Sequence, residues 1–177
     1  MIGKVYNIPP QPAVAENTRR LPAGAVTLGV EYREVDPDGL VATYQDNPAH
    51  LTELLEKSPP GGFTDEGVSI HVWGTEDGHE YLRFDVFEAE PHYHYVHRSE
   101  EVVNNVVDFD VAANGDMLTW VLERLRTRLA EMLRQAGGEH LVEKLDRGLV
   151  ERAVDEAAAI AAHAHEMQRA LREARRG

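Results

Sequence analysis

No cysteine occurs among the 177 residues of the chain. This absence excludes disulfide bonds, thiolate metal sites such as zinc ribbons, and cysteine nucleophiles. No apolar run approaches the roughly 20 residues that a membrane-spanning helix needs. The opening residues, MIGKVYNIPP, have neither the basic start nor the apolar stretch of a signal peptide. We therefore expect a soluble, cytoplasmic protein that has no membrane partner.

The motifs of several large enzyme classes are also missing. The sequence contains no Walker loop, no glycine-rich dinucleotide fingerprint, no HExxH and no GxSxG. The expected helices carry no ExxH pair of the kind that builds a di-iron bundle. These absences exclude the usual forms of nucleotide-binding, dinucleotide-binding, zincin and α/β-hydrolase enzymes.

Negative charge is concentrated in the first two thirds of the chain, whose formal net charge is −13 at pH 7. Residues 116–177 contain 11 acidic and 11 basic side chains, so the whole excess lies in residues 1–115. An acidic surface repels nucleic-acid phosphates and anionic lipids, and we expect no nucleic acid as partner. Metal cations and basic partners remain compatible with it. Solubility alone also explains such a surface.

The first 60 residues predict an arm, a hairpin and a short helix. Residues 1–24 include NIPPQPAVAENTRRLPAG, which is too rich in proline for regular structure and predicts an extended arm. AVTLGVEYREV alternates with a period of two, and DPDG followed by LVATYQ predicts a β-hairpin. DNPAHLTELLEKSPPGG predicts a short helix with Asn47 as N-cap and Pro48 in its first turn.

Residues 67–112 predict a β-meander that is followed by a covering helix. The runs GVSIHVWG, HEYLRFDVFE, PHYHYVHR and EVVNNVVDFDVA are rich in β-branched and aromatic residues and have short connections. Neighbouring strands should therefore pair antiparallel in a sheet of four to six strands. Residues 116–136 keep a helical period of apolar side chains and predict a helix that covers one face of the sheet.

The last segment differs in kind because its apolar residues repeat every seven positions. The repeat places Val150, Ala157, Ala164 and Leu171 at one heptad position, and Ala153, Ile160 and Met167 at another. This pattern predicts a coiled-coil-like helix that makes a homo-oligomer. An amphipathic helix that packs on its own domain is the alternative.

The predicted fold class is therefore α+β: a mostly antiparallel sheet covered on one face by a helix, with a C-terminal coiled-coil-like helix. The predicted domains are an extended N-terminal arm over residues 1–24, an α+β domain over residues 25–138, and a helical oligomerisation element over residues 139–177.

A histidine-rich stretch, FEAEPHYHYVHRSEE at residues 87–101, carries the clearest chemical signal. In a strand, residues two apart share a face, so His92 and His94 point the same way. Two imidazoles at this spacing can converge on one metal ion. Tyr93 and Tyr95 point to the other face and are pocket candidates that pack more readily than they react.

The partners of these histidines depend on strand register. A turn centred on Ala89 and Glu90 places Asp85 opposite His94, and a turn centred on Ser99 and Glu100 places Asn105 opposite His94 on its other side. Such a row could bind a divalent metal (Zn, Fe or Mn). It could instead make His94 a catalytic general base that is oriented by Asp85.

A second arrangement remains open. If Pro91 lies at a β-bulge, then Glu88, Glu90, His92 and His94 alternate onto one face. Two carboxylates and two imidazoles would also suit Zn, Fe or Mn. His71 joins either site if its strand lies beside the central one.

The run LRFDVFEAEPHYHYVH resembles a segment of a group of uncharacterised bacterial proteins that share a Leu-Arg-Phe-Asp and Pro-His-Tyr-His-Tyr core. The resemblance covers residues 67–136 and implies no known activity.

Two functions follow from the residues. The first is a small-molecule enzyme or binding protein whose metal ligands come from His92, His94, Asp85 and Glu90. The alternative is a non-enzymatic assembly protein that has an acidic recognition surface.

Overall fold

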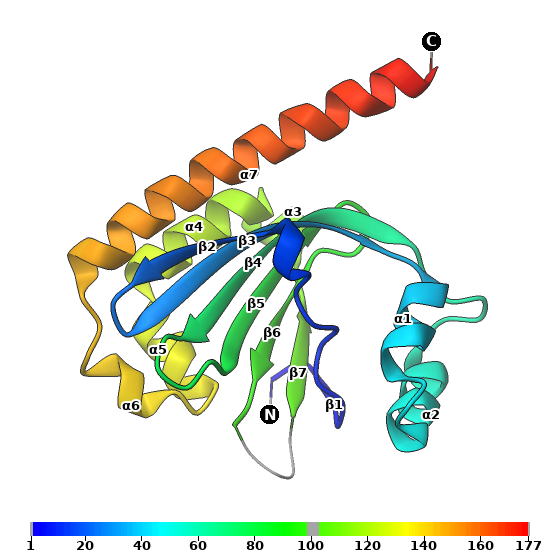
Figure 1. Cartoon of the computed structure of the whole chain (residues 1–177), viewed down its shortest axis with the longest axis horizontal. Helices are drawn as coiled ribbons and strands as arrows, with labels where there is room; N and C mark the ends of the chain where they lie inside the picture. Colours follow the sequence, from blue (N-terminus) through cyan, green and yellow to red (C-terminus); the bar gives the residue numbers. More distant parts are fainter. Residues whose placement is uncertain (1, 99–102, 177) are drawn as a thin grey trace.

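The computed structural model describes residues 2–98 and 103–176, and within them the chain forms one antiparallel sheet and a set of helices (Figure 1). The strands are β1 (Lys4–Tyr6), β2 (Thr18–Ala23), β3 (Val26–Val35), β4 (Asp65–Gly74), β5 (Glu80–Phe87), β6 (His92–Val96) and β7 (Asn104–Asp108). The helices are a short 3-10 turn, η1 (Ala15–Asn17), then α1 (Pro37–Tyr44), α2 (Pro48–Lys57), α3 (Val111–Asn114), α4 (Met117–Thr127), α5 (Leu129–Gln135), α6 (Glu139–Val142) and α7 (Arg147–Arg176). The α+β class and the antiparallel meander are confirmed.

The sheet has seven strands in the order β1-β7-β6-β5-β4-β3-β2, which is more than the expected four to six. Two of these strands, β1 and β2, come from the proline-rich start of the chain, where no strand was expected. β1 pairs with β7, and β2 pairs with β3. Pro22 is accommodated because β2 is an edge strand, where a residue without an N–H group breaks no ladder. The prediction that residues 1–24 lack regular structure was therefore wrong.

The prediction of a hairpin after β3 was also wrong, because the run LVATYQ, which was expected to be its second strand, lies largely in the helix α1. Asp36 acts as its N-cap and accepts a hydrogen bond from the amide of Gly39, and Pro37 occupies the first turn. The sequence DPDG therefore starts a helix. The α2 helix is confirmed, and the Asn47 side chain accepts from the amide of His50 as expected of an N-cap.

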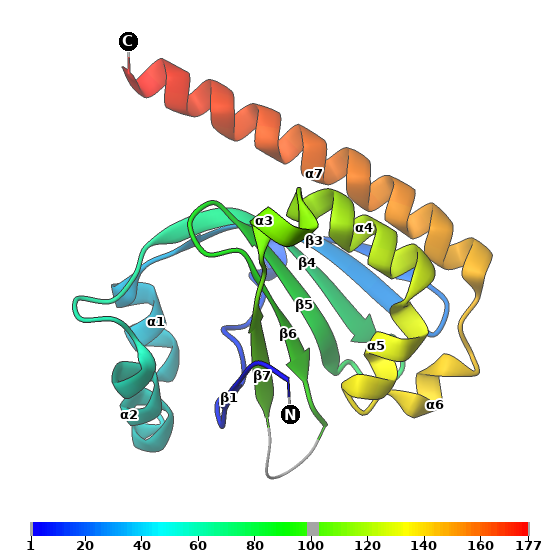
Figure 2. The same cartoon turned by 180° about the vertical axis from the view of Figure 1, so that it is seen from behind.

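One face of the sheet forms the hydrophobic core with α4, α5 and α7, which Figure 2 shows lying across it. Phe84 and Tyr93 are paired on neighbouring strands and both contact Trp120 of α4. Asp116 is the N-cap of α4, and the predicted helix over 116–136 is interrupted at Arg128. The covering helix is confirmed in place, although it has two segments.

The long helix α7 packs its first half on the same core. Its buried residues are Val150, Ala153, Val154, Ala157 and Ala161, and this half lies against β2, β3 and α4. Farther along, Met167 and Leu171 are 53% and 48% exposed, and Arg172 pairs with Glu66 and Glu88. The first half of the heptad pattern thus serves the chain's own core. Self-association through the second half stays a prediction.

None of the helices formed by residues 2–98 and 103–176 is both long and apolar enough to cross a membrane.

The division of α7 predicts different outcomes for two truncations. A chain that ends at Ala164 should keep its fold, because it retains every residue of α7 that the structure describes as buried, and the Arg172 ion pairs that it loses lie at the surface and contribute little. A chain that ends at Gly148 should lose cooperative unfolding, because the apolar face of β2 and β3 becomes uncovered. Thermal unfolding followed by circular dichroism distinguishes them, and a cooperative transition in the shorter chain would contradict the assignment.

Candidate metal centre

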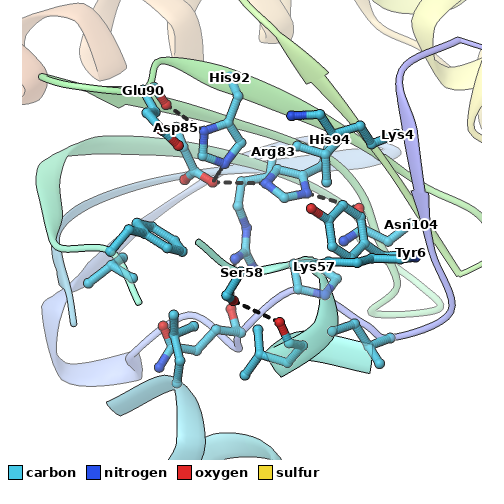
Figure 3. A pocket seen from close by; sticks show the side chains of 18 of the residues that line it. Lys4, Tyr6, Lys57, Ser58, Arg83, Asp85, Glu90, His92, His94 and Asn104 are labelled. Carbon is cyan, nitrogen blue, oxygen red and sulfur yellow. Dashed lines mark hydrogen bonds and ion pairs between the residues drawn. The ribbon is translucent and has the colours of Figure 1, made fainter. Parts of the chain in front are cut away.

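Strands β5 and β6 bring three polar side chains together on the sheet face opposite α4, α5 and α7. Asp85 is paired with His92, and His94 lies two residues farther along the same face of β6. One donor atom from each of Asp85, His92 and His94 lies within 4.8 Å of the others, so these residues could hold a metal ion. Figure 3 shows both imidazole rings turned toward the Asp85 carboxylate.

The carboxylate of Asp85 is the centre of the cluster. Its Oδ2 atom lies 3.0 Å from Nε2 of His94 and 3.3 Å from Nε2 of His92. Its other oxygen accepts a hydrogen bond from the hydroxyl of Ser69 on β4. Asp85 and His94 are buried, and His92 is partly exposed. A buried carboxylate with this set of partners is held in one orientation.

The other nitrogen of each imidazole faces a carbonyl oxygen. Nδ1 of His92 lies 2.7 Å from the backbone oxygen of Glu90, and Nδ1 of His94 lies 2.9 Å from the amide oxygen of Asn104. Carbonyl oxygens accept hydrogen bonds and donate none, so each Nδ1 carries the hydrogen. In the neutral form of each ring, Nε2 therefore directs a lone pair toward Asp85.

Burial and mutual contact shift the pKa values of the cluster in different directions. Burial favours the neutral acid, but the contacts with His92 and His94 hold the pKa of Asp85 well below its usual range. Burial lowers the pKa of His94, whereas the contact with Asp85 outweighs burial at His92 and raises its pKa. These directions favour protonation of His92 over protonation of His94.

A second buried carboxylate fixes the loop that precedes β6. The oxygens of Asp65 accept hydrogen bonds from the backbone amides of Ala89 at 3.1 Å and Glu90 at 2.8 Å. These contacts hold the backbone on the N-terminal side of Glu90, the residue whose carbonyl oxygen contacts His92. Sequence reasoning missed Asp65, because it lies 25 residues before Glu90 and belongs to no motif.

The cluster opens into a cavity of about 440 Å³ between the sheet and the helices α1 and α2. Lys57 of α2 and Ser58, the residue that follows this helix, lie across the cavity from Asp85 in Figure 3. Apolar and aromatic side chains form much of the remaining wall, among them Ile8, Leu40, Tyr44, Leu54, Phe63 and Phe87.

The N-terminal arm closes one side of this cavity and is tied down at Gln11. The backbone oxygen of Gln11 accepts from Arg83 at 2.7 Å and from Arg33 at 3.3 Å. Its side-chain oxygen accepts from Arg33, and its amide nitrogen donates to the Thr43 hydroxyl on α1. Gln11 therefore joins the arm, the sheet and α1. No sequence signal marked it.

A buried ionic network lies beside the cluster and contains His71. Its two ring nitrogens lie 2.6 Å from Glu80 and 3.1 Å from Glu31. Arg83 donates two hydrogen bonds to Glu80, and Arg33 pairs with Glu31. His71 is thus on the same sheet face, as its strand position allows, but it contacts this network and not the metal centre.

The structure corrects the expected register on both sides of His94. Asp85 is opposite His92, and Arg83 is opposite His94. This shift of two residues keeps Asp85 on the expected face. On the other side the shift is one residue, which puts Asn104 on the face of His94 and moves Asn105 to the helix-covered face. The turn expected at Ser99 and Glu100 lies outside the described residues.

The other residues proposed from the sequence supply no donor to the cluster of Asp85, His92 and His94. Pro91 is not a bulge within one strand, because β5 ends at Phe87 and β6 begins at His92. Glu90 lines the cavity, but its carboxylate is not among the three converging donors. Tyr93 and Tyr95 stack edge-on with each other on the core face, and Asn105 bonds to His97.

The buried network predicts how stability depends on pH. Burial opposes ionisation of Glu80, but the charge of Arg83 and the bonds to His71 and Arg83 lower its pKa from 4.5 to about 2. The ionised group therefore stabilises the folded state above pH 4.5, by about 3 kcal/mol, and this contribution is lost as the pH falls toward 2. Glu80→Gln should lower stability at pH 7 and reduce the further loss between pH 7 and pH 3.

Urea unfolding at the two pH values measures both effects. The matched control is Glu76→Gln, since Glu76 is exposed and pairs only with exposed Lys144 among the described residues. That variant should follow the wild type at each pH. An equal acid-induced loss in Glu80→Gln and wild type would show that the network does not hold Glu80 ionised.

Comparison with protein families gives a match but no activity. The family model described as a domain of unknown function, DUF7700, matches residues 20–161. This range includes the run LRFDVFEAEPHYHYVH and ends at Ala161, a buried residue of α7. No curated protein and no solved structure matches the chain. The chain belongs to this family of unknown function, DUF7700.

Proposed function

We propose that Asp85, His92 and His94 bind one divalent metal ion (Zn, Fe or Mn), and that the protein is a small-molecule enzyme or binding protein built around that ion. The single observation that supports this most is the fixed orientation of both imidazoles. Their Nδ1 hydrogens are used by Glu90 and Asn104, so both Nε2 lone pairs converge on one carboxylate oxygen. Lone pairs that converge in this way repel unless a cation or a proton lies among them.

The distances support the same proposal. Metal bonds to imidazole nitrogen and carboxylate oxygen of about 2.0–2.2 Å place neighbouring donors about 3.0–3.5 Å apart. The two Nε2–Oδ2 distances, 3.0 and 3.3 Å, fall in this range. The hydrogen bonds from Nδ1 to carbonyl oxygens and from Ser69 to Asp85 are those that usually orient metal ligands.

Three protein donors leave coordination positions for a ligand. Two imidazoles and one carboxylate suit zinc, iron or manganese, and a site of this kind keeps its remaining positions open toward solvent or substrate. Here the open side faces the cavity. An ion in this place would polarise a bound carbonyl group or lower the pKa of a bound water molecule.

A metal-free alternative uses the same residues. The raised pKa of His92 and the lowered pKa of Asp85 describe an ion pair beside a neutral His94, which could act as a general base. This alternative requires that no ion binds. Metal content therefore decides between the two.

Metal analysis of protein purified without an affinity tag should find about one equivalent of Zn, Fe or Mn per chain. His92→Ala, His94→Ala and Asp85→Asn each remove one of three donors, so each should lower the bound metal by at least tenfold after dialysis. Inductively coupled plasma mass spectrometry measures the content, and thermal unfolding confirms that each variant is folded.

The matched control removes two histidines elsewhere. His163→Ala with His165→Ala lies on exposed positions of α7 and should leave the metal content unchanged. A folded wild-type protein that binds no ion after incubation with zinc, manganese or ferrous iron would refute the proposal and leave the metal-free ion pair.

The support from Asp65 gives a further prediction. Asp65→Ala frees the amides of Ala89 and Glu90 and loosens the carbonyl that orients His92, so zinc affinity should fall about 10–100-fold. Asp116→Ala is the control, because it also removes a carboxylate bound to a backbone amide, at the start of α4. It should destabilise the protein by about 1 kcal/mol without changing zinc affinity, as measured by competition with a chromogenic chelator.

A further inference from the structure

The cavity beside the proposed metal site has cationic and anionic side chains in nearly equal number. Four cationic side chains line it (Lys4, Arg33, Lys57 and Arg83), with three carboxylates (Asp85, Glu90 and Asp108). Each cation is paired with a carboxylate: Lys4 with Asp108, Arg33 with Glu31, Lys57 with Glu53 and Arg83 with Glu80. The wall around the site therefore adds little net charge of its own.

A divalent ion at the proposed site would bring an uncompensated positive charge to this cavity. Asp85 contributes one negative charge, and both histidines are neutral when their Nε2 atoms bind metal, so the loaded centre carries a net charge of about +1. In a cavity with apolar walls this charge is weakly screened. A negatively charged oxygen donor is the ligand that neutralises it.

The rest of the wall selects an apolar body for that donor. Ile8 and Tyr44 are 4% and 6% exposed, and Leu54 and Phe63 add further apolar surface. The arginines on the sheet are neutralised by Glu80 and Glu31 and are bonded to Gln11, so the ion and not these arginines would attract a charged ligand. The volume of about 440 Å³ suits a small organic molecule.

From these observations, and on the basis of the metal site proposed above, we infer that the cavity binds a small organic acid. Its carboxylate occupies an open position on the ion, and its apolar or aromatic body lies against the wall formed by α1, α2 and the arm. Recognition then combines one charged contact at the sheet with apolar burial at the helices.

Titration calorimetry with zinc-loaded protein tests this inference. Benzoate should bind at least tenfold more tightly than benzamide, which has nearly the same shape but no charge. Inorganic phosphate, which has charge but no apolar body, should also bind at least tenfold more weakly. Removal of zinc by chelation should abolish most benzoate binding.

A pair of adjacent leucines gives a matched control. Leu54 lines the cavity, whereas Leu55 is 59% exposed on the same helix. Leu54→Glu places a negative charge on the apolar wall and should weaken benzoate binding at least tenfold, with zinc content unchanged. Leu55→Glu should bind benzoate like the wild type.

The outcomes separate the two proposals. If zinc binds but benzoate does not, or if benzamide or phosphate binds equally well, the organic-acid inference is overturned and the metal site stands. Equal benzoate binding by Leu54→Glu and Leu55→Glu also overturns it. If none of zinc, manganese and ferrous iron binds, both proposals are overturned; if only manganese or iron binds, the same titrations are made with that ion.

Discussion

The site depends on one constraint: Asp85 is a carboxylate in the middle of a sheet, and its charge must be compensated where water is scarce. Ser69 on β4 donates a hydrogen bond to this carboxylate, and the imidazoles of His92 and His94 on β6 contact its other oxygen. A lone buried charge would cost several kcal/mol, so removal of these partners would leave the acid neutral or the sheet unstable. The same compensation makes the cluster suited to a cation, because its donors already converge.

The two faces of the sheet divide stability from chemistry. Phe84 and Tyr93 point to the helices and belong to the core, whereas Asp85 and His94 point to the cavity. Strand alternation produces this division within consecutive residues. The helices α4, α5 and α7 cover the first face. The polar face is instead enclosed by α1, α2 and the N-terminal arm, which line the cavity.

Sequence patterns predicted the features that depend on local spacing. They failed for the features that depend on how distant segments of the chain are placed against one another. The meander, the shared face of His92 and His94, and the N-cap Asn47 follow from local spacing. Register across β6 and β7 does not, since it depends on the length of a turn, and one residue exchanged Asn105 for Asn104. The heptad pattern of α7 was ambiguous because a seam of small residues packs equally well on a sheet or on another helix.

Part of the cavity wall comes from residues outside the range that the family model matches. The family match begins at residue 20, yet Ile8 and Gln11 help to enclose the cavity from before that point. The strands that carry Asp85, His92 and His94 lie inside the matched range, so the proposed metal site lies in the part of the chain that the family model matches. The segment before residue 20 also supports the sheet, because β1 pairs with β7 and the backbone oxygen of Gln11 accepts a hydrogen bond from Arg83. This segment therefore completes both the sheet and the cavity of the matched domain.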